Sequence, residues 1–269
     1  MTAVRLHGPS AAAIALASAV GLLAFAWPLL AQADSTAVAH AADAPLLFAL
    51  VVPLLLLILF AQLGDGSIDA KGIAMLGVLA AVIAALRPLG GGTAGLEPIW
   101  AILVLGGYAL GPGFGFCLGA VSLFASALLT GGVGPWLPFQ MLGAAWVGMG
   151  AGFLPRLAGR RELIMLSGYS ALACIAYGWL LNLWFWPFTS GLPDQIAYTA
   201  GASTAENALA WLRFRMITSL GYDLPRAALT VALVLVAGRP ILRALRRMSR
   251  RAAFDAPVAF NRPLDEAVR

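Results

Sequence analysis

Residues 98–130 read PIWAILVLGGYALGPGFGFCLGAVSLFASALLT and contain no charged side chain. Two apolar runs, about Pro98–Gly111 and Gly113–Thr130, flank the sequence Gly111-Pro112-Gly113. Because glycine and proline interrupt helices, we expect two membrane-crossing helices joined by a tight turn. The first run is short for a span of about 20 residues. One long broken helix therefore remains as an alternative interpretation.

The composition extends this interpretation to the whole chain. Of its 269 residues, 61% are hydrophobic and only 11% are charged, and the mean hydropathy is +0.88. A soluble domain carries about 25% charged residues, so the surface of this protein is suited to lipid rather than water. Cys117 and Cys174 lie inside apolar runs, and their spacing indicates neither a disulfide framework nor a metal site.

Six further apolar segments accompany the first two. We expect them at about Ser10–Ala31, Pro45–Leu63, Gly72–Arg87, Leu137–Leu154, Leu163–Phe188 and Ser219–Gly238. The predicted fold is an all-α integral membrane protein with eight transmembrane helices. The polar tail after Arg251, residues 252–269, is expected to be disordered.

Two segments allow a more specific interpretation. The first apolar segment precedes Ala31-Gln32-Ala33, which resembles a signal-peptidase site, so a cleaved signal peptide is an alternative. Its apolar stretch of about 21 residues exceeds the 7–15 typical of signal peptides, and we favour a retained span. In the long segment before the last span, Glu206–Arg215 predicts a short interfacial helix with Trp211 and Phe214 toward lipid.

The distribution of arginine and lysine predicts the orientation. With eight spans and a cytoplasmic N-terminus, the 17 basic residues divide into 13 inside and 4 outside. Cytoplasmic loops are enriched in basic residues, so we expect a multi-pass protein of the bacterial cell (inner) membrane with both termini in the cytoplasm. The basic run from Arg239 to Arg251 directly follows an apolar segment, which is typical of a membrane flank contacting lipid headgroups and not of a nucleic-acid site.

Motifs for catalysis are absent from the sequence. His7 and His40 lie in expected loops, and neither HExxH nor GxSxG occurs. The glycines of Gly111-Pro112-Gly113-Phe114-Gly115 lack the Lys-Ser/Thr of a phosphate-binding loop. We therefore expect no enzyme activity, no catalytic residue, no cofactor and no metal site. The pairs Gly115/Gly119 and Gly148/Gly152 have the spacing of helix-packing glycines.

Small residues form two stripes on the segment Gly72–Arg87. One stripe consists of Gly77, Ala81 and Ala85, and the adjoining stripe of Ala80 and Ala84. Small residues at a spacing of four let another helix approach closely. The approaching helix can belong to this chain or to a separate membrane subunit, and the sequence leaves both interpretations open.

Tryptophans and polar residues gather at the predicted outer boundary. Six of the eight tryptophans lie there, beside the glycine-rich loops 87–98 and 131–140. Pockets combine apolar walls with a few placed polar groups, so we predict a binding site for a large, mainly uncharged ligand. Its candidate residues are Arg87, Gly91, Gly92, Trp100, Trp136, Gln140, Asn182 and Trp186. A one-sided aromatic belt, helix–helix hydrogen bonds of the amides and an Arg87–Glu97 pair are the alternatives.

Five stretches carry a resemblance to a known family. They are Arg87–Gly92 (RPLGGG), Gly111–Gly115 (GPGFG), Gly134–Met141 (GPWLPFQM), Asn182–Phe188 (NLWFWPF) and Thr218–Arg226 (TSLGYDLPR). Together they resemble the substrate-binding S component of an energy-coupling factor (ECF) vitamin transporter, most of all the branch associated with cobalamin. The resemblance covers about residues 71–251.

The resemblance implies a fold, a function and partners. Six helices would hold the vitamin near the outer face, beneath the loop after the first helix. An AxxxA motif on that helix would dock the T subunit; it maps onto Ala80 and Ala84, with Ala81 and Ala85 one residue out of register. Two ATP-binding subunits would supply energy, since this chain has no Walker motif. The resemblance thus implies a six-helix bundle preceded by two extra N-terminal transmembrane helices, which depart from the family pattern. The parts would be an N-terminal extension (residues 1–70), a six-helix substrate-binding membrane domain (71–251) and a disordered cytoplasmic tail (252–269).

Two other functions fit the composition. One is a stand-alone small-molecule permease, and the other is a non-transporting membrane scaffold protein. Ion-coupled permeases generally carry charged residues deep in their spans, and the predicted spans hold none at depth, which counts against the permease.

Overall fold

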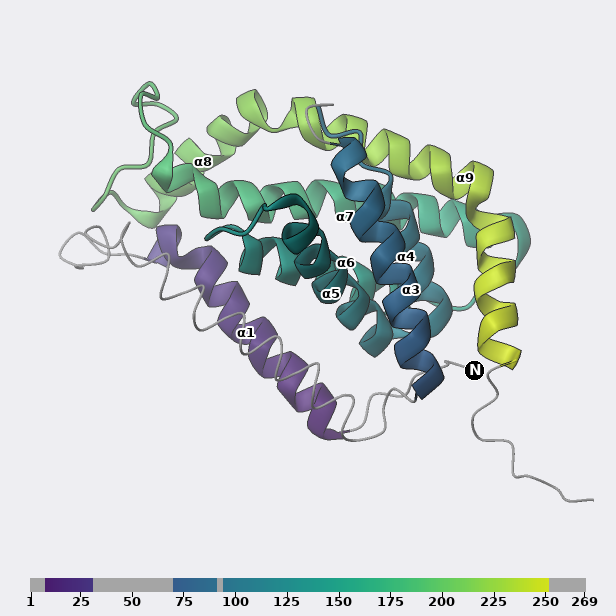
Figure 1. The fold of residues 1–269 in the computed structure, drawn as a ribbon. Helices are drawn as coiled ribbons and strands as arrows, with labels where there is room; N and C mark the ends of the chain where they lie inside the picture. The colour runs from purple at the N-terminus through teal and green to yellow at the C-terminus, as the bar shows by residue number, and fades with distance from the viewer. Residues whose placement is uncertain (1–7, 31–69, 91–93, 252–269) are drawn as a thin grey trace, which may run out of the picture.

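The computed structural model describes residues 8–30, 70–90 and 94–251, which form helices and connecting loops without a strand (Figure 1). This confirms the all-α membrane bundle. The helices are α1 (Gly8–Leu30), α3 (Ala70–Leu86), α4 (Ile99–Leu110), α5 (Pro112–Thr130), α6 (Leu137–Phe153), α7 (Gly159–Phe185), α8 (Thr204–Thr218) and α9 (Leu220–Arg251), with short 3₁₀ helices η2 (Arg87–Gly90) and η3 (Trp186–Phe188). The predicted span Pro45–Leu63 and the tail 252–269 lie outside the described residues.

Five of the described helices are long and apolar enough to cross a membrane. They are α1, α3 continued into η2, α5, α7 continued into η3, and α9. Helix α4 has only 12 residues and is too short to span the hydrocarbon core straight. All of its residues except Ile102 are buried against other helices. It is therefore a buried element of the bundle rather than a lipid-facing span.

The turn at Gly111 is the predicted tight turn. Gly111 has φ 110°, a conformation that favours glycine, and Pro112 begins α5 directly after it. A Cβ atom on Gly115 would lie 2.9 Å from the Cα of Gly107, so the two helices fold back on each other. The structure therefore shows two helices and not one long broken helix.

Glycines bring α4, α5 and α6 into backbone contact. A Cβ atom added to Gly115 would lie 2.2 Å from the carbonyl oxygen of Gly148, and one added to Gly119 would lie 2.3 Å from that of Ala144. A Cβ atom on Gly152 would lie 2.4 Å from the nitrogen of Pro112. These positions admit no side chain, which confirms the prediction that both glycine pairs serve helix packing.

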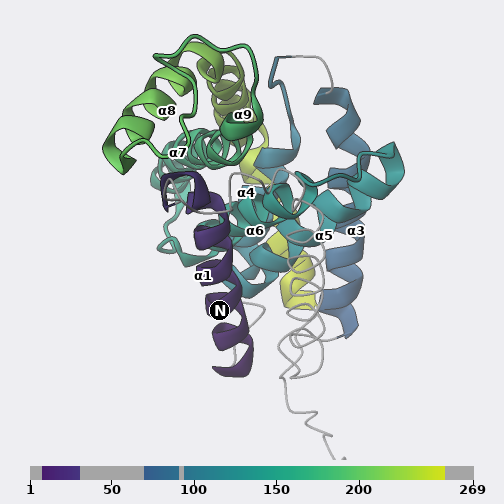
Figure 2. The same cartoon turned by 90° about the vertical axis from the view of Figure 1, so that its left-hand side faces the viewer.

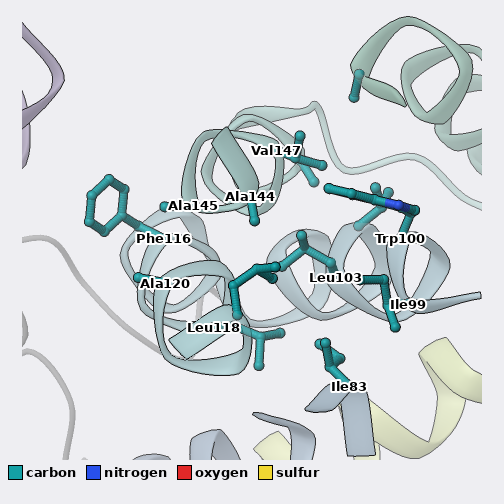
Figure 3. Close-up of a cluster of buried hydrophobic side chains, with 14 of the residues drawn as sticks. Ile83, Ile99, Trp100, Leu103, Phe116, Leu118, Ala120, Ala144, Ala145 and Val147 are labelled. Atoms are coloured by element: carbon teal, nitrogen blue, oxygen red, sulfur yellow. The ribbon is translucent and has the colours of Figure 1, made fainter. Parts of the chain in front are cut away.

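The hydrophobic core surrounds this junction. Helix α3 supplies Ile83, α4 supplies Trp100 and Leu103, α5 supplies Leu118, and α6 supplies Ala144 and Val147 (Figure 3). Helices α1 and α3 lie on opposite sides of the α5–α6 pair (Figure 2). Most of the core therefore comes from α3 onward, and α1 adds Ile14, Ala17 and Phe25 to it from one side.

Two helices are longer than the sequence predicted. Helix α7 begins at Gly159 instead of Leu163, and α9 continues through the basic run to Arg251 instead of ending at Gly238. Within that run Leu242 and Leu245 are buried, and this apolar face keeps the segment helical. Pro240 removes one backbone hydrogen bond, and Figure 1 shows α9 changing direction in its second half.

Helix α8 is present where an interfacial helix was predicted. Its first turn carries a capping box, in which Ser203 and Glu206 satisfy each other's backbone amides, and these hydrogen bonds lower the pKa of Glu206. The expectation that Phe214 faces lipid is wrong. Phe214 is buried, with its ring centroid 6.5 Å from that of Trp186, because the aromatic cluster at this end of the bundle offers a better-packed environment than the interface.

Helix α1 packs against α6 and α7. The Phe25 ring is buried, with centroids 5.0 Å from Phe139 and 5.7 Å from Trp146, and the Trp146 indole donates to Ser18 Oγ at 2.9 Å. At its C-terminal end, the Leu29 carbonyl accepts from Thr204 Oγ1 at 3.0 Å. The helix is thus joined to the bundle by specific contacts along its length.

Candidate ligand-binding site

A cavity of about 670 Å³ opens at one end of the bundle. Its lining comes from η2, the starts of α4, α6 and α9, the end of α7, and α8, together with Leu123 of α5. These segments are far apart in the sequence, and all except Leu123 were assigned to the outer boundary. The volume lies within the roughly 300–1,000 Å³ range of small-molecule sites. We call this end of the molecule the cavity end.

Aromatic side chains from several helices line the cavity. Trp100 and Tyr177 pack at a tilted angle with their ring centroids 4.3 Å apart, and Trp184 packs against Phe139 at 4.9 Å and Phe188 at 5.7 Å. Further aromatic rings complete the lining: Trp136, Phe185, Phe214 and Tyr222. Such a wall contacts a large planar or apolar ligand over an extended area.

A charged cluster lies in the same lining. The Arg226 guanidinium donates to Glu97 Oε2 at 3.1 Å and to Asp223 Oδ1 at 2.9 Å, and Glu97 Oε2 also accepts from the Trp100 indole at 2.6 Å. The Arg226 side chain is 10% exposed and that of Asp223 is 2% exposed. The cluster therefore joins the start of α4 to α9 through hydrogen bonds that are largely removed from solvent.

Arg87 occupies a separate position at the end of α3. Its Nη2 donates to Gln140 Oε1 at 2.6 Å, and its Nη1 lies 3.5 Å from Ser126 Oγ. Among the described residues no carboxylate forms an ion pair with it. The alternative of an Arg87–Glu97 pair is therefore not observed, because Glu97 turns toward Arg226 instead.

Two buried acceptor atoms in the lining have no hydrogen-bond partner. One is Asp223 Oδ2 and the other is Asn182 Oδ1. The Asn182 amide donates to Ser219 Oγ, which realises the helix–helix hydrogen bond that was one alternative for this residue. A buried polar atom without a partner is unusual in a folded protein, so both atoms require an explanation.

The predicted site residues fall into three groups. Arg87, Trp100, Trp136, Gln140 and Asn182 all line the cavity. Trp186 does not; it is fully buried and donates to the Ile196 carbonyl at 2.7 Å, so its part is to hold the outer loop. Gly91 and Gly92 lie outside the described residues.

Sequence reasoning missed many polar and aromatic members of the lining. Among them are the charged cluster and the ring beside it: Glu97, Tyr177, Asp223 and Arg226. A signal for two of them was present, since Asp223 and Arg226 stand three residues apart within an otherwise apolar predicted span. Charged residues in such segments are rare and usually functional.

The two small-residue stripes of α3 face different surroundings. Ala80 and Ala84 are 2% and 4% exposed and point into the bundle, whereas Gly77, Ala81 and Ala85 are exposed. A Cβ atom on Gly77 would meet no atom within 4 Å. The burial of Ala80 and Ala84 argues against their use as a docking surface, because their own bundle already covers them.

Comparison with curated proteins and with solved structures gives no match. A family model described as the ECF transporter, substrate-specific component, matches residues 71–241. The match covers α3 to the first part of α9 and leaves α1 outside. The chain therefore belongs to the family of ECF transporter substrate-specific components.

Proposed function

We propose that this protein captures a vitamin, cobalamin or a related corrinoid, at the outer face of a bacterial cytoplasmic membrane. It then delivers the ligand inward together with an ECF T subunit and two ATP-binding subunits. The observation that carries the proposal is the convergence of five predicted site residues, from four separate helices or their ends, on one aromatic cavity. Neither the chain nor its site performs covalent chemistry in this function.

The cavity lining supports a bulky ligand of mixed polarity. Its wall combines large aromatic rings with amide, carboxylate and guanidinium groups. A corrinoid presents a broad apolar ring surface edged with carboxamides and a phosphodiester. Apolar faces would contact Trp100, Trp136 and Trp184, while the edge groups would reach the polar side chains.

For the partner surface we propose the exposed stripe of α3. Gly77, Ala81 and Ala85 present backbone without bulky side chains, so a helix of the T subunit could approach closely. Replacing Ala81 and Ala85 with leucine should prevent assembly of the full transporter while leaving ligand binding by the isolated subunit unchanged. Leucine at Ala80 and Ala84 should instead destabilise the subunit itself, since both side chains are buried.

The proposed orientation has a direct test. Cysteine introduced at Ala200, in the exposed loop before α8, should react with an impermeant thiol reagent in intact cells. Cysteine at Ala158, in the exposed loop between α6 and α7, should react only after the cells are opened. The native Cys117 and Cys174 are buried and give little background. Labelling of Ala158→Cys in intact cells contradicts the orientation.

The function is tested by purifying the full chain in detergent and titrating it with cyanocobalamin in a calorimeter. Corrin absorbance in the purified protein gives an independent measurement. We expect saturable binding by the isolated chain, and uptake into liposomes only when the T and ATP-binding subunits are added with ATP. Uptake by the chain alone would identify a stand-alone permease. Binding of no solute at all would favour a scaffold.

A further inference from the structure

Resting on the proposed function, we infer that the ligand donates a hydrogen bond from a neutral N–H group, such as a carboxamide, to Asp223, and places an acceptor oxygen against Arg87. The inference begins from Asp223, which lines the cavity and is 2% exposed. Its Oδ1 is bound by Arg226, but its Oδ2 has no partner. A carboxylate oxygen can accept two hydrogen bonds, so Oδ2 can accept hydrogen bonds from a group in the cavity.

The fold makes room for this carboxylate at the cavity wall. A Cβ atom on Gly178 of α7 would lie 1.8 Å from Asp223 Oδ1 and 2.6 Å from Oδ2. Any other residue at position 178 would displace the Asp223 side chain. Gly178 also lines the cavity, so the glycine lets the carboxylate reach the wall between α7 and α9.

The surrounding charges favour a neutral donor over a cation. The lining contains two arginines, Arg87 and Arg226, and two carboxylates, Glu97 and Asp223, so its formal charges cancel. Arg215 of α8 is also buried and close enough to attract Asp223 electrostatically. An ammonium group beside Asp223 would be repelled by the guanidinium groups of Arg226 and Arg215. An amide N–H satisfies the free oxygen without that repulsion.

At Arg87 the ligand must supply a hydrogen-bond acceptor instead of a donor. Among the described residues, the Arg87 guanidinium donates to two neutral oxygens, those of Gln140 and Ser126. A guanidinium carries five N–H donors, so at least some of them are available to a further acceptor. A carbonyl or phosphate oxygen of the ligand is the complementary group. The two positions together define a ligand with a donor and an acceptor separated by an apolar body.

Asp223→Asn is a closely matched test. Asparagine keeps an oxygen for Arg226 and replaces the free oxygen with an NH₂ group, so the site changes from acceptor to donor with almost no change of volume. The probes are cyanocobalamin and its monocarboxylic acids, each with one side-chain carboxamide changed to a carboxylate. The control is Asp194→Asn, which alters an exposed carboxylate that does not line the cavity.

We expect wild type to bind at least one monocarboxylic acid more weakly than cyanocobalamin, by about 10-fold or more. Asp223→Asn should reduce or reverse that preference for the same acid, and Asp194→Asn should leave it unchanged. A reversal of preference cannot arise from misfolding, since a damaged site would lose both compounds. Equal wild-type affinity for all the acids, or an unaltered preference in Asp223→Asn, overturns the inference.

Failure of the corrinoid assignment gives a different result. If wild type does not bind cyanocobalamin, the assignment of the ligand as a corrinoid is retired, and the compound that co-purifies with wild type is identified by mass spectrometry. The inference then requires that this compound carries a neutral N–H donor and is depleted from Asp223→Asn preparations but not from Asp194→Asn preparations. A co-purified compound without such a donor, or no co-purified compound in either preparation, overturns it.

Discussion

Helix α9 carries two arginines that meet carboxylates and an aromatic ring at opposite ends of the bundle. At the cavity end, Arg226 joins Glu97 and Asp223, with its guanidinium carbon 5.8 Å from the centroid of Trp100. At the other end, which we call the tail end, Arg246 joins Glu162, with its guanidinium carbon 5.8 Å from the centroid of Tyr108. The same chemical groups thus occur in two different settings.

The two ends differ in whether both oxygens of the carboxylate accept hydrogen bonds. At the tail end both Glu162 oxygens accept from Arg246. The Tyr108 hydroxyl there donates to the Pro155 carbonyl and accepts from the Leu157 amide. At the cavity end Asp223 keeps one oxygen unpartnered beside an open space. A satisfied pair serves to join helices, whereas an unsatisfied one in a cavity is suited to receive a ligand.

The largest expected effect concerns the junction that holds the two ends together. Gly119→Val would place side-chain atoms within about 2.4 Å of the backbone of Ala144 and Ala145. Because α5 and α6 cannot separate without opening the core, we expect destabilisation of more than about 4 kcal/mol. Little monodisperse protein should survive in size-exclusion chromatography after extraction. Gly168→Ala, on the exposed face of α7 with open space around it and an ordinary helical backbone, is the control for handling losses.

Removing each arginine in turn tests the comparison itself. Arg226→Met leaves Glu97 and the buried Asp223 without their cation, and we expect a loss of about 3–5 kcal/mol of stability. Arg246→Met leaves Glu162, whose side chain is 8% exposed, without its cation. Because the Arg246 side chain is 34% exposed and only one carboxylate loses its partner, we expect a smaller loss of about 2 kcal/mol. Thermal unfolding in detergent measures both. Equal shifts in melting temperature would show that the two clusters do not differ in the way proposed.

Helix α1 lies outside the family match, yet it supports the cavity wall. Phe25 packs on Phe139, which packs on the lining residue Trp184. Phe25→Ala should cost about 2 kcal/mol of stability. This is less than in a water-soluble core, because apolar surface that becomes exposed to lipid is less unfavourable than apolar surface exposed to water. Thermal unfolding is the measurement. Leu23→Ala, on the exposed face of the same helix, should have almost no effect.

The same contacts address whether α1 is retained. A cleaved signal peptide would leave Phe139 and Trp146 without their α1 partners. We therefore expect N-terminal sequencing and intact mass of the mature protein to include residues 8–30. A mature protein beginning after Ala33 would contradict this, and the Phe25→Ala variant would then match wild type in stability.

The smallest expected effect is at the rim of the cavity. Trp136 is 41% exposed, and its indole donates to the Gly132 carbonyl at 3.2 Å. A ligand contact at such a position is only partly removed from solvent, so Trp136→Ala should weaken cyanocobalamin binding by about 1 kcal/mol, or roughly 5-fold. Calorimetric titration tests this. A loss as large as that for a deep lining residue such as Trp100 would show that the ligand sits near the rim.

The sequence by itself determined the class of fold and the approximate positions of most helices that the structure describes. Long uncharged runs such as residues 98–130 can be solvated only by lipid, and glycine and proline mark their ends. These are local properties of the chain, so they can be recognised without knowing its neighbours. The glycine pairs of α5 and α6 were also assigned correctly to packing, because their spacing is itself local.

Only the tertiary structure decided which polar groups meet. Glu97 lies ten residues from Arg87 and 129 from Arg226, yet it pairs with the distant arginine. The two stripes of α3 both consist of small residues, so the sequence does not distinguish them. Only the packing of α3 against α4 and α5 shows that Ala80 is buried and Ala81 is exposed. Pairing and burial depend on how helices rotate against one another. That rotation is fixed by the close approach of whole surfaces, a property that no single segment contains.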